Sequence, residues 1–375
     1  MPLPRPDRRA LLLGVGALGA LAACSAPAAS PRANAPVSTE PLDAVRADGP
    51  RQAGIADPPI AQRHCDLSIW DVPDWRSTLR ALLAGWSELI VSLANGSAPA
   101  LAGLAPSALT VTVGLGPRVV AAIDPALPGA QDLPAFAGER ISEQHRGGDL
   151  MLQVCASDPL VVSLAVGELT RAAGTALRSR WRQTAFRGPS RPDGAARNML
   201  GFVDGIVVPR GEQEMNREVW LEGPERVRGG SIAVVRRMRL DATGFLGLPT
   251  TEQEQIFGRR RDTAEPLSGG GPEAEVDLGA KTADGQYLVP ADSHVRRAHP
   301  LTSGSGIMLR RSYSFDDGPA DRGLLFIAFQ RELRTFVATQ HRLDEGDRLM
   351  RFAVTTASGT FLVLPGLPLG RALLR

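Results

Sequence analysis

The stretch "HCDLSIWDVPDWRSTLRALLAGWSELIVSL", residues 64–93, sets the fold class of this chain. In its first nine residues apolar and polar side chains alternate, which predicts a strand with one face in the core. From residue 74 the apolar side chains recur at helical spacing, which predicts an amphipathic helix to residue 93. A strand followed by a helix opens several mixed α and β folds, and the rest of the chain decides among them.

The same alternation continues along the chain. The next predicted elements are strands over residues 108–117 and 148–157 and a helix over 159–177. After a break rich in Arg, Pro and Gly the order begins again, with strands at 229–241, 307–315, 323–332 and 359–366 and helices at 250–260 and 333–343. Two copies of one motif predict an α+β protein with two ferredoxin-like (split βαβ) modules and antiparallel sheets. A dinucleotide-binding fold is disfavoured because no G-x-G-x-x-G turn follows the first strand.

The composition is that of a globular protein. The chain has 375 residues, of which 43% are hydrophobic and 22% charged, enough for one large domain or two smaller ones. It has 42 basic and 40 acidic residues, a formal net charge of +2. This balance lacks the strong positive charge of a nucleic-acid-binding domain, so we expect no nucleic-acid partner.

The N-terminus has the features of an export signal. In "RPDRRALLLGVGALGALAAC" the pair Arg8 and Arg9 precedes an uncharged run, residues 10–23, that is too short to span a bilayer. A twin-arginine pair at this place resembles the Tat signal, which exports folded proteins and suits an enzyme that takes up its cofactor before export. We therefore expect the Tat translocase as a partner and a periplasmic, cell-surface or secreted location.

Two alternatives fit the end of this signal. Residues 21–24 resemble a lipobox, in which Cys24 would be diacylated and become the mature N-terminus, but a plain secretory signal also ends in small residues. Residues 25–59 are rich in Ala, Pro and Ser and show no hydrophobic period, which predicts a disordered linker. The predicted domains are thus a signal (1–24), the linker (25–59), an N-terminal module carrying the GFVDG segment (60–222) and a C-terminal module (223–375).

The cysteines and histidines do not form a metal-binding pattern. Cys65 and Cys155 lie in strand-like runs, and they form either a disulfide or two unpaired buried thiols. No histidine lies in metal-ligand spacing, so we expect no zinc site with several protein ligands, whereas a macrocycle needs only one. His294, in "PADSHVRRAHP" (residues 290–300), is by itself most simply a surface or half-buried loop residue.

One carboxylate is unusual. Asp204 lies between apolar residues and a glycine in "RNMLGFVDGIVVPR", residues 197–210. An Asp-Gly pair is common in ordinary turns, so this segment alone does not indicate catalysis. It gains meaning only together with the segments that follow.

Seven segments resemble, in order, the signature segments of dye-decolourising (DyP-type) haem peroxidases. They are residues 51–59, 133–159, 197–205, 229–241, 292–300, 309–316 and 323–333. The GFxDG and DxHxRxAxP motifs are the most specific pair. The resemblance implies one haem b per chain, bound in the C-terminal module against the segment that carries Asp204.

The resemblance also implies residue roles. Asp204 would be the distal acid-base group, Arg310 the distal cation and His294 the axial ligand of the haem iron. Such an enzyme reduces hydrogen peroxide and oxidises aromatic or dye-like donors by one electron. Its optimum would be acidic, because a carboxylate beside an arginine has a lowered pKa. Further haem contacts are implied for Gly205, Ile206, Val207, His299 and Pro300.

The sequence departs from the family pattern in places. Ile206 and Val208 replace a threonine and an asparagine, and Ser312 replaces a glycine. Asp347 is the candidate to accept the second ring N–H of His294, a contact that increases electron donation to the iron.

Two questions stay open from the sequence. One arginine among Arg236, Arg237 and Arg239 would pair with a haem propionate, and the aromatic residues Tyr313, Tyr287 and Trp220 are either electron relays or core residues.

A second function fits the same resemblance. The superfamily includes deferrochelatase-like members, so the chain would alternatively be a haem-binding component of an iron uptake system with iron-uptake partners. The sequence is compatible with an oligomer but does not require one.

Overall fold

The computed structural model describes residues 43–374, which belong to one compact unit. The predicted signal, Cys24 and the first part of the predicted linker lie outside the described residues. Within them, the prediction that the linker is disordered as far as residue 59 is wrong. Ile55 is fully buried, and the buried Gln52 amide donates to the backbone oxygens of Val113 and Leu364, at 2.8 Å each. Individual buried side chains, such as Ile55 and Gln52, anchor residues 43–59 to the rest of the protein. The segment is therefore ordered although its sequence has no hydrophobic period.

The N-terminal module has the predicted ferredoxin-like arrangement. Its elements are β1 (His64–Asp71), α1 (Trp75–Ala94), β2 (Thr110–Leu115), β3 (Leu150–Ala156), α3 (Pro159–Ala173) and β4 (Arg178–Phe186). The strands are antiparallel in the order β4-β1-β3-β2. The sequence pattern did not predict β4, whose outward residues are mostly arginines and whose inward residues include Trp181 and Ala185. Its pattern is that of a strand with only one buried face.

The C-terminal module repeats this order. Its main elements are β7 (Ser231–Leu240), α6 (Thr250–Phe257), β9 (Tyr313–Asp316), β10 (Arg322–Gln330), α9 (Leu333–Asp344) and β11 (Ala353–Val363). The strands run β9-β10-β7-β11, all antiparallel. The prediction of two ferredoxin-like modules is therefore confirmed.

The two sheets join at both edges into one closed ring. β11 pairs with β2 through Leu362 and Val363, and β4 pairs with β9 through Phe186 and Ser314. One apolar cluster, including Leu67, fills the space between the sheets. The predicted boundary at residue 222 therefore does not separate two independent cores, because both modules contribute to this one.

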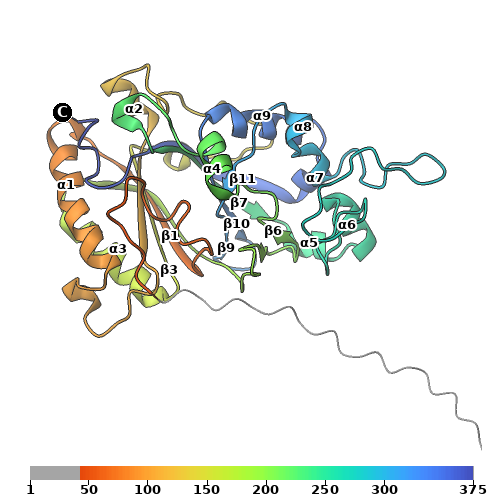
Figure 1. The fold of residues 1–375 in the computed structure, drawn as a ribbon, viewed down its shortest axis with the longest axis horizontal. Coiled ribbons are helices and arrows are strands. Elements are labelled where there is room, and N and C mark those ends of the chain that lie inside the picture. Colours follow the sequence, from red (N-terminus) through yellow and green to blue (C-terminus); the bar gives the residue numbers. More distant parts are fainter. Residues whose placement is uncertain (1–42, 375) are drawn as a thin grey trace, which may run out of the picture. The chain divides into compact units, whose positions relative to one another are not determined.

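Helices cover the outer faces of the ring. α1 and α3 lie side by side on the N-terminal module, and α9 packs its Phe336 against Val234 and Ala328 of the other (Figure 1). Near α9 lie two short helices, α7 (His294–Arg297) and α8 (Pro300–Ser303) (Figure 1). Among the described residues, no helix combines the length and apolar composition needed to cross a bilayer.

Several short elements lie between the modules or within the C-terminal module. They are β5 (Ala196–Arg197), β6 (Val203–Asp204), α4 (Gly211–Glu218), α5 (Ala242–Leu246), β8 (Leu309–Arg310) and the 3₁₀ turn η4 (Arg348–Phe352). Two of them, β6 and β8, carry Asp204 and Arg310. The predicted strand 307–315 is thus divided between β8 and β9. Both strands pair with β10 in one register. At the break between them, the Ile327 N–H donates to the Ser312 hydroxyl oxygen at 3.4 Å.

A connecting segment, residues 133–148, ties the modules together and is called the strap. Its backbone bonds to β11, with the Arg140 N–H donating to the Thr355 oxygen (2.9 Å) and the Gly147 N–H to the Ser358 oxygen (2.8 Å). The strap thus extends from the N-terminal module along the last strand of the C-terminal module.

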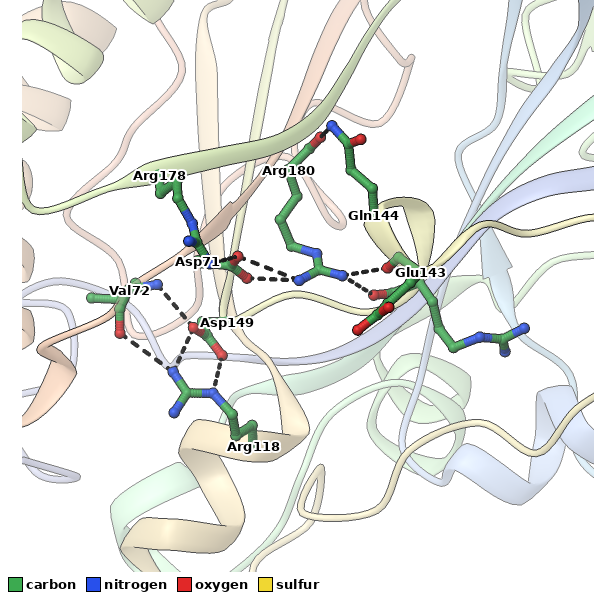
Figure 2. Close-up of polar contacts among 9 residues, drawn as sticks. Asp71, Val72, Arg118, Glu143, Gln144, Asp149, Arg178 and Arg180 are labelled. Atoms are coloured by element: carbon green, nitrogen blue, oxygen red, sulfur yellow. Dashed lines mark hydrogen bonds and ion pairs between the residues drawn. The ribbon is translucent and has the colours of Figure 1, made fainter.

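Arg180 of β4 holds the other side of the strap (Figure 2). Its guanidinium donates to the backbone oxygens of Glu143 and Arg146 and bonds to the Asp71 carboxylate at 3.0 Å. Figure 2 shows Arg180 reaching from its strand to both groups, so one side chain joins the end of β1 to the strap.

Within the strap, Glu139 makes a buried ion pair with Arg236 of β7. The two side chains are 7% and 2% exposed, and the Nη2 to Oε1 distance is 2.7 Å. The guanidinium also lies over the rings of Phe136 and Phe336, at 5.0 and 5.6 Å from their centroids. Removing either partner would leave a charge in an apolar site.

We predict that Glu139→Ala lowers the free energy of unfolding by about 3–5 kcal/mol, because Arg236 loses its carboxylate where water cannot replace it. Denaturant unfolding of the variant and the parent measures this change. As a control, Glu225→Ala removes the partner of Arg228 at the surface and should change stability by no more than about 0.5 kcal/mol. Equal effects of the two substitutions would contradict the prediction.

Candidate functional site

Asp204 ends a two-stranded ribbon made by β5 and β6. Its Cα partner in the ribbon is Ala196, and Gly205 follows it with φ +91°, a conformation that favours glycine. The turn brings the Gly205 N–H to 2.7 Å from Asp204 Oδ1. The glycine therefore fixes the direction of the carboxylate as well as the turn.

Arg310 of β8 binds the same carboxylate oxygen. Its Nε and Nη2 lie 3.3 and 3.2 Å from Asp204 Oδ1, and its Nη1 donates to the Val207 oxygen at 3.1 Å. Three N–H groups thus converge on Oδ1. Oδ2 accepts no hydrogen bond from the described residues, which leaves it available to take a proton.

The neighbouring arginine points the other way. Arg311 is 5% exposed and donates to the backbone oxygens of Ile55 and Pro58, at 3.0 and 2.8 Å. Only one of the two arginines was expected to face the site because side chains alternate along a strand. The structure places Arg310 there, and Arg311 holds the N-terminal segment instead.

A pocket opens beside the ion pair. Its lining includes Arg187, Arg197, Asp204, Arg310, Ser312 and Tyr313. Arg187 was not predicted from the sequence. It follows β4, and its Nη2 donates to the Gly194 oxygen at 3.1 Å. The alternating, arginine-rich run over residues 178–187 is the signal that points to this residue. A ferredoxin-like module has four strands, and the sequence pattern predicts only three for the first module.

The charges around Asp204 favour its ionised form. Burial alone would raise the pKa of the carboxyl, but Arg310, the Gly205 N–H and the charge of Arg187 outweigh burial and hold it below its usual value. Since the site has more positive than negative charge, Asp204 stays a carboxylate into acid.

His294, the first residue of α7, is held by Asp347. Its Nδ1 lies 2.6 Å from Asp347 Oδ2, and the other carboxylate oxygen of Asp347 accepts from the Leu349 N–H at 2.8 Å. Burial opposes the protonated ring, yet the Asp347 carboxylate raises the pKa of His294 above its ordinary value. Asp204 and Arg310 are close enough for their charges to act on the ring as well.

The other predicted contact residues lie in the turns that follow His294 and Asp204 in the chain. His299 is the N-cap of α8, where its Nδ1 accepts from the Leu301 N–H at 3.2 Å, and Pro300 begins that helix. Ile206 and Val207 form the loop after Asp204, and their backbone oxygens accept from Arg210 and Arg310 respectively.

The arginines of β7 are largely engaged elsewhere. Arg236 binds Glu139, and Arg237 binds Asp317 and Asp321 at 3.0 and 2.8 Å. In the part of the chain that the structure describes, Arg239 has no carboxylate partner. Of the three, it is the one still free to pair with another anion.

Comparison with known proteins gives matches over both modules. The family model for the N-terminal part of Dyp-type peroxidases matches residues 52–187, and the model for the C-terminal part matches residues 195–367. The chain belongs to the Dyp-type peroxidase family. As a member it is a haem peroxidase, whose substrates are a peroxide and an electron donor. The family division lies near residue 190 rather than at the predicted 222, so it assigns the GFVDG segment to the C-terminal part.

Individual relatives agree with this assignment. The peroxidase is 36% identical to a dye-decolorizing peroxidase of Thermobifida fusca, over 90% of this chain and 86% of that one. It is 31% identical to a deferrochelatase of Escherichia coli O157:H7, over 99% and 97% of the two chains. The solved structure of an oxyferrous complex of DtpA from Streptomyces lividans superposes with a TM-score of 0.83 at 33% identity, covering 89% of this chain and 98% of that one.

The residues present fit the haem that the family implies. Because His294 Nδ1 is engaged by Asp347, Nε2 is the nitrogen left for an iron, and the carboxylate fixes the ring in the way that carboxylates orient metal-binding histidines. The imidazole side chain is 33% exposed, so protein does not cover it on all sides. Asp204 and Arg310 keep similar accessible fractions, 31% and 25%.

We predict that Arg310→Leu raises the pKa of Asp204, because the substitution removes a cation that lowers this pKa while burial of the carboxyl remains. Below its pKa the acid cannot accept a proton, so the acid limb of the pH profile of peroxide reduction should move to higher pH. Steady-state rates of the holoenzyme from acid to neutral pH measure this limb.

The substitution Arg228→Leu, at an exposed pair, serves as the control and should leave the limb in place. An unmoved limb in Arg310→Leu would show that another group sets it.

Proposed function

We propose that this enzyme uses one haem b per chain to reduce hydrogen peroxide, with Asp204 as acid-base group, Arg310 as distal cation and His294 as axial ligand. The observation that carries the proposal is the asymmetric binding of the Asp204 carboxylate. The Gly205 N–H and two N–H groups of Arg310 hold Oδ1, whereas Oδ2 is left to exchange a proton.

His294 and Asp347 would hold the cofactor. Bound haem iron supplies the redox chemistry with which a peroxidase cleaves the O–O bond and oxidises its donor. The Asp347 carboxylate keeps the proton on His294 Nδ1, orients the ring and increases the electron density at Nε2. Arg239 is the candidate to bind a propionate, since Arg236 and Arg237 already bind carboxylates.

Asp204 and Arg310 would handle the protons and charge of the peroxide. Oδ2 takes the proton from one peroxide oxygen and returns it to the other, which then leaves as water. The Arg310 guanidinium stabilises the negative charge that develops as the bond breaks. Since a general base works best near its own pKa, the lowered pKa of Asp204 favours an acidic optimum and weak turnover at neutral pH.

The pocket sets a limit on the donor. Charged and polar side chains line it, among them Asp204, Arg310 and Arg187, and they suit a small polar molecule such as peroxide better than a large aromatic dye. Bulky aromatic donors would therefore give up electrons at the surface. Tyr287 is 46% exposed, whereas Trp220 is buried and Tyr313 belongs to the core.

For the cellular location, we propose export of the folded enzyme through the Tat translocase. Arg8 and Arg9 support this route, and Cys24 supports a cell-surface lipoprotein, with a periplasmic or secreted enzyme as the alternative.

A second function is favoured by the relatives called deferrochelatase, a name that denotes removal of iron from a chelate. The enzyme would then handle haem iron in an uptake system. Incubating the holoenzyme with a ferrous chelator separates the two. Dye oxidation on adding peroxide supports the peroxidase, whereas fluorescent metal-free porphyrin without dye oxidation supports iron removal.

We predict that Asp204→Asn lowers kcat/KM for hydrogen peroxide by about 10²–10⁴-fold, the usual contribution of a positioned acid-base group, and leaves haem bound. Stopped-flow mixing with peroxide and the Soret spectrum measure the two effects. The control Asp132→Asn changes an exposed carboxylate and should keep full activity. Full activity of Asp204→Asn would exclude Asp204 as the proton carrier.

We also predict that His294→Ala loses most of its haem, because the chain then lacks the axial nitrogen. Pigment content per chain after purification measures this loss. His145→Ala, on an exposed turn, is the matched control and should keep its haem. Undiminished haem and activity in His294→Ala would refute the assignment of the ligand.

A further inference from the structure

Two cysteines and a tyrosine form a buried chain that begins at the wall of the pocket. Cys65 of β1, Cys155 of β3 and Tyr313 of β9 belong to the apolar cluster inside the ring, and each is 2% exposed or less. The reaction proposed above uses none of them. Both thiols are free, which decides between the two alternatives that the sequence left open.

The two cysteines face each other across the sheet. They are direct partners in the antiparallel β1 and β3 pair, so their side chains are neighbours on the same face of the sheet. Directly opposed residues of such a pair have Cα atoms about 4.5–5.5 Å apart. A disulfide spans Cα distances of about 4.4–6.8 Å, so the two sulfur atoms can join without moving the strands.

Tyr313 connects this pair to the site. Its side chain is part of the pocket wall together with Asp204 and Arg310, and it lies in the same buried cluster as Cys155, near enough for the phenol and the thiol to act on each other electrostatically. The Arg187 guanidinium lies 5.8 Å from the centroid of its ring. A continuous path of side chains thus leads from the pocket to Cys65.

Direct reaction of the thiols with peroxide is disfavoured. Both thiols are buried inside the ring, so dissolved peroxide cannot reach either sulfur atom. Oxidation must therefore reach the pair through a neighbouring side chain. Tyr313 is the one that touches both the pocket and the pair.

We propose that Tyr313, Cys155 and Cys65 are an internal electron source that reduces peroxide when no external donor is present, and that the pair becomes a cross-strand disulfide. The inference rests on the proposed peroxidase function. It assigns a covalent modification to residues that have no part in binding peroxide or haem iron.

The electrons and protons balance with hydrogen peroxide as the oxidant. Tyr313 loses one electron and its phenolic proton, and the Cys155 S–H bond breaks as its hydrogen atom restores the phenol. The Cys155 sulfur then bonds to the Cys65 sulfur, which releases its proton and the second electron. The O–O bond breaks, and the two thiols and one peroxide give one disulfide and two waters.

The test is peptide mapping of the reduced holoenzyme after peroxide is added without donor. We expect a peptide pair linked through Cys65 and Cys155, two hydrogens lighter than the free peptides. Peroxide-treated haem-free protein should lack the link, and a dye donor should suppress it. The chain has only two tyrosines, so Tyr287→Phe is the matched control and should form the link, whereas Tyr313→Phe should not.

Each outcome decides the inference. Thiols that stay reduced in an enzyme that oxidises dye refute it and leave the peroxidase function intact, and failure of both reactions refutes both. A link that forms equally in Tyr313→Phe or in haem-free protein refutes the path through Tyr313. Cys65→Ala, whose side chain lies outside the pocket wall, should leave dye oxidation unchanged and retain a free Cys155 thiol.

Discussion

The closure of two four-stranded sheets into one ring is the constraint on which the rest of the structure depends. An open ferredoxin-like sheet has two strand edges with unpaired backbone groups. Here the edge strands of each module pair with those of the other, β11 with β2 and β4 with β9. The closed ring has a single inner core, and its register fixes every side chain that points out of it. The strap and its buried Glu139 and Arg236 pair hold this closure from outside.

The site lies where short elements, among them β6 and β8, meet the ring of strands. Arg310 lies on a strand of two residues that β10 holds in register, while Asp204 ends a short ribbon outside the main sheet. Their ion pair therefore joins the ring to the connection between modules. His294 and Asp347 form a second pair across α7 and the turn before η4. Each functional side chain thus has a partner of opposite charge that sets its direction and its protonation.

Much of this could be predicted from the sequence, for physical reasons that differ between parts. Hydrophobic periodicity identified most strands and helices, because a buried face imposes a period on the residues that form it. It missed β4, where arginines occupy the outward positions, and it missed the order of residues 43–59, which depends on single contacts such as that of Gln52. The motifs single out Asp204, His294 and Arg310, and Asp347 is a candidate from a segment that resembles the family only weakly. The structure brings Asp204 to Arg310 and His294 to Asp347. Arg187 and the facing of Cys65 and Cys155 depend on tertiary register, which no local pattern contains.

The placement of Arg310 and Arg311 on opposite faces of one strand joins two distant parts of the molecule. One guanidinium lies in the pocket, and the next is bound by the oxygens of residues 55 and 58 inside the ring. A slip of this strand by one residue would exchange the two faces. In one direction the slip would move Arg310 to an interior position without these acceptors, and in the other it would put Leu309 in place of Arg310 opposite the carboxylate in the pocket. The position of the segment before β1 and the geometry of the pocket therefore both depend on the register of this strand. An insertion or deletion in the turn that precedes β8 would disturb both.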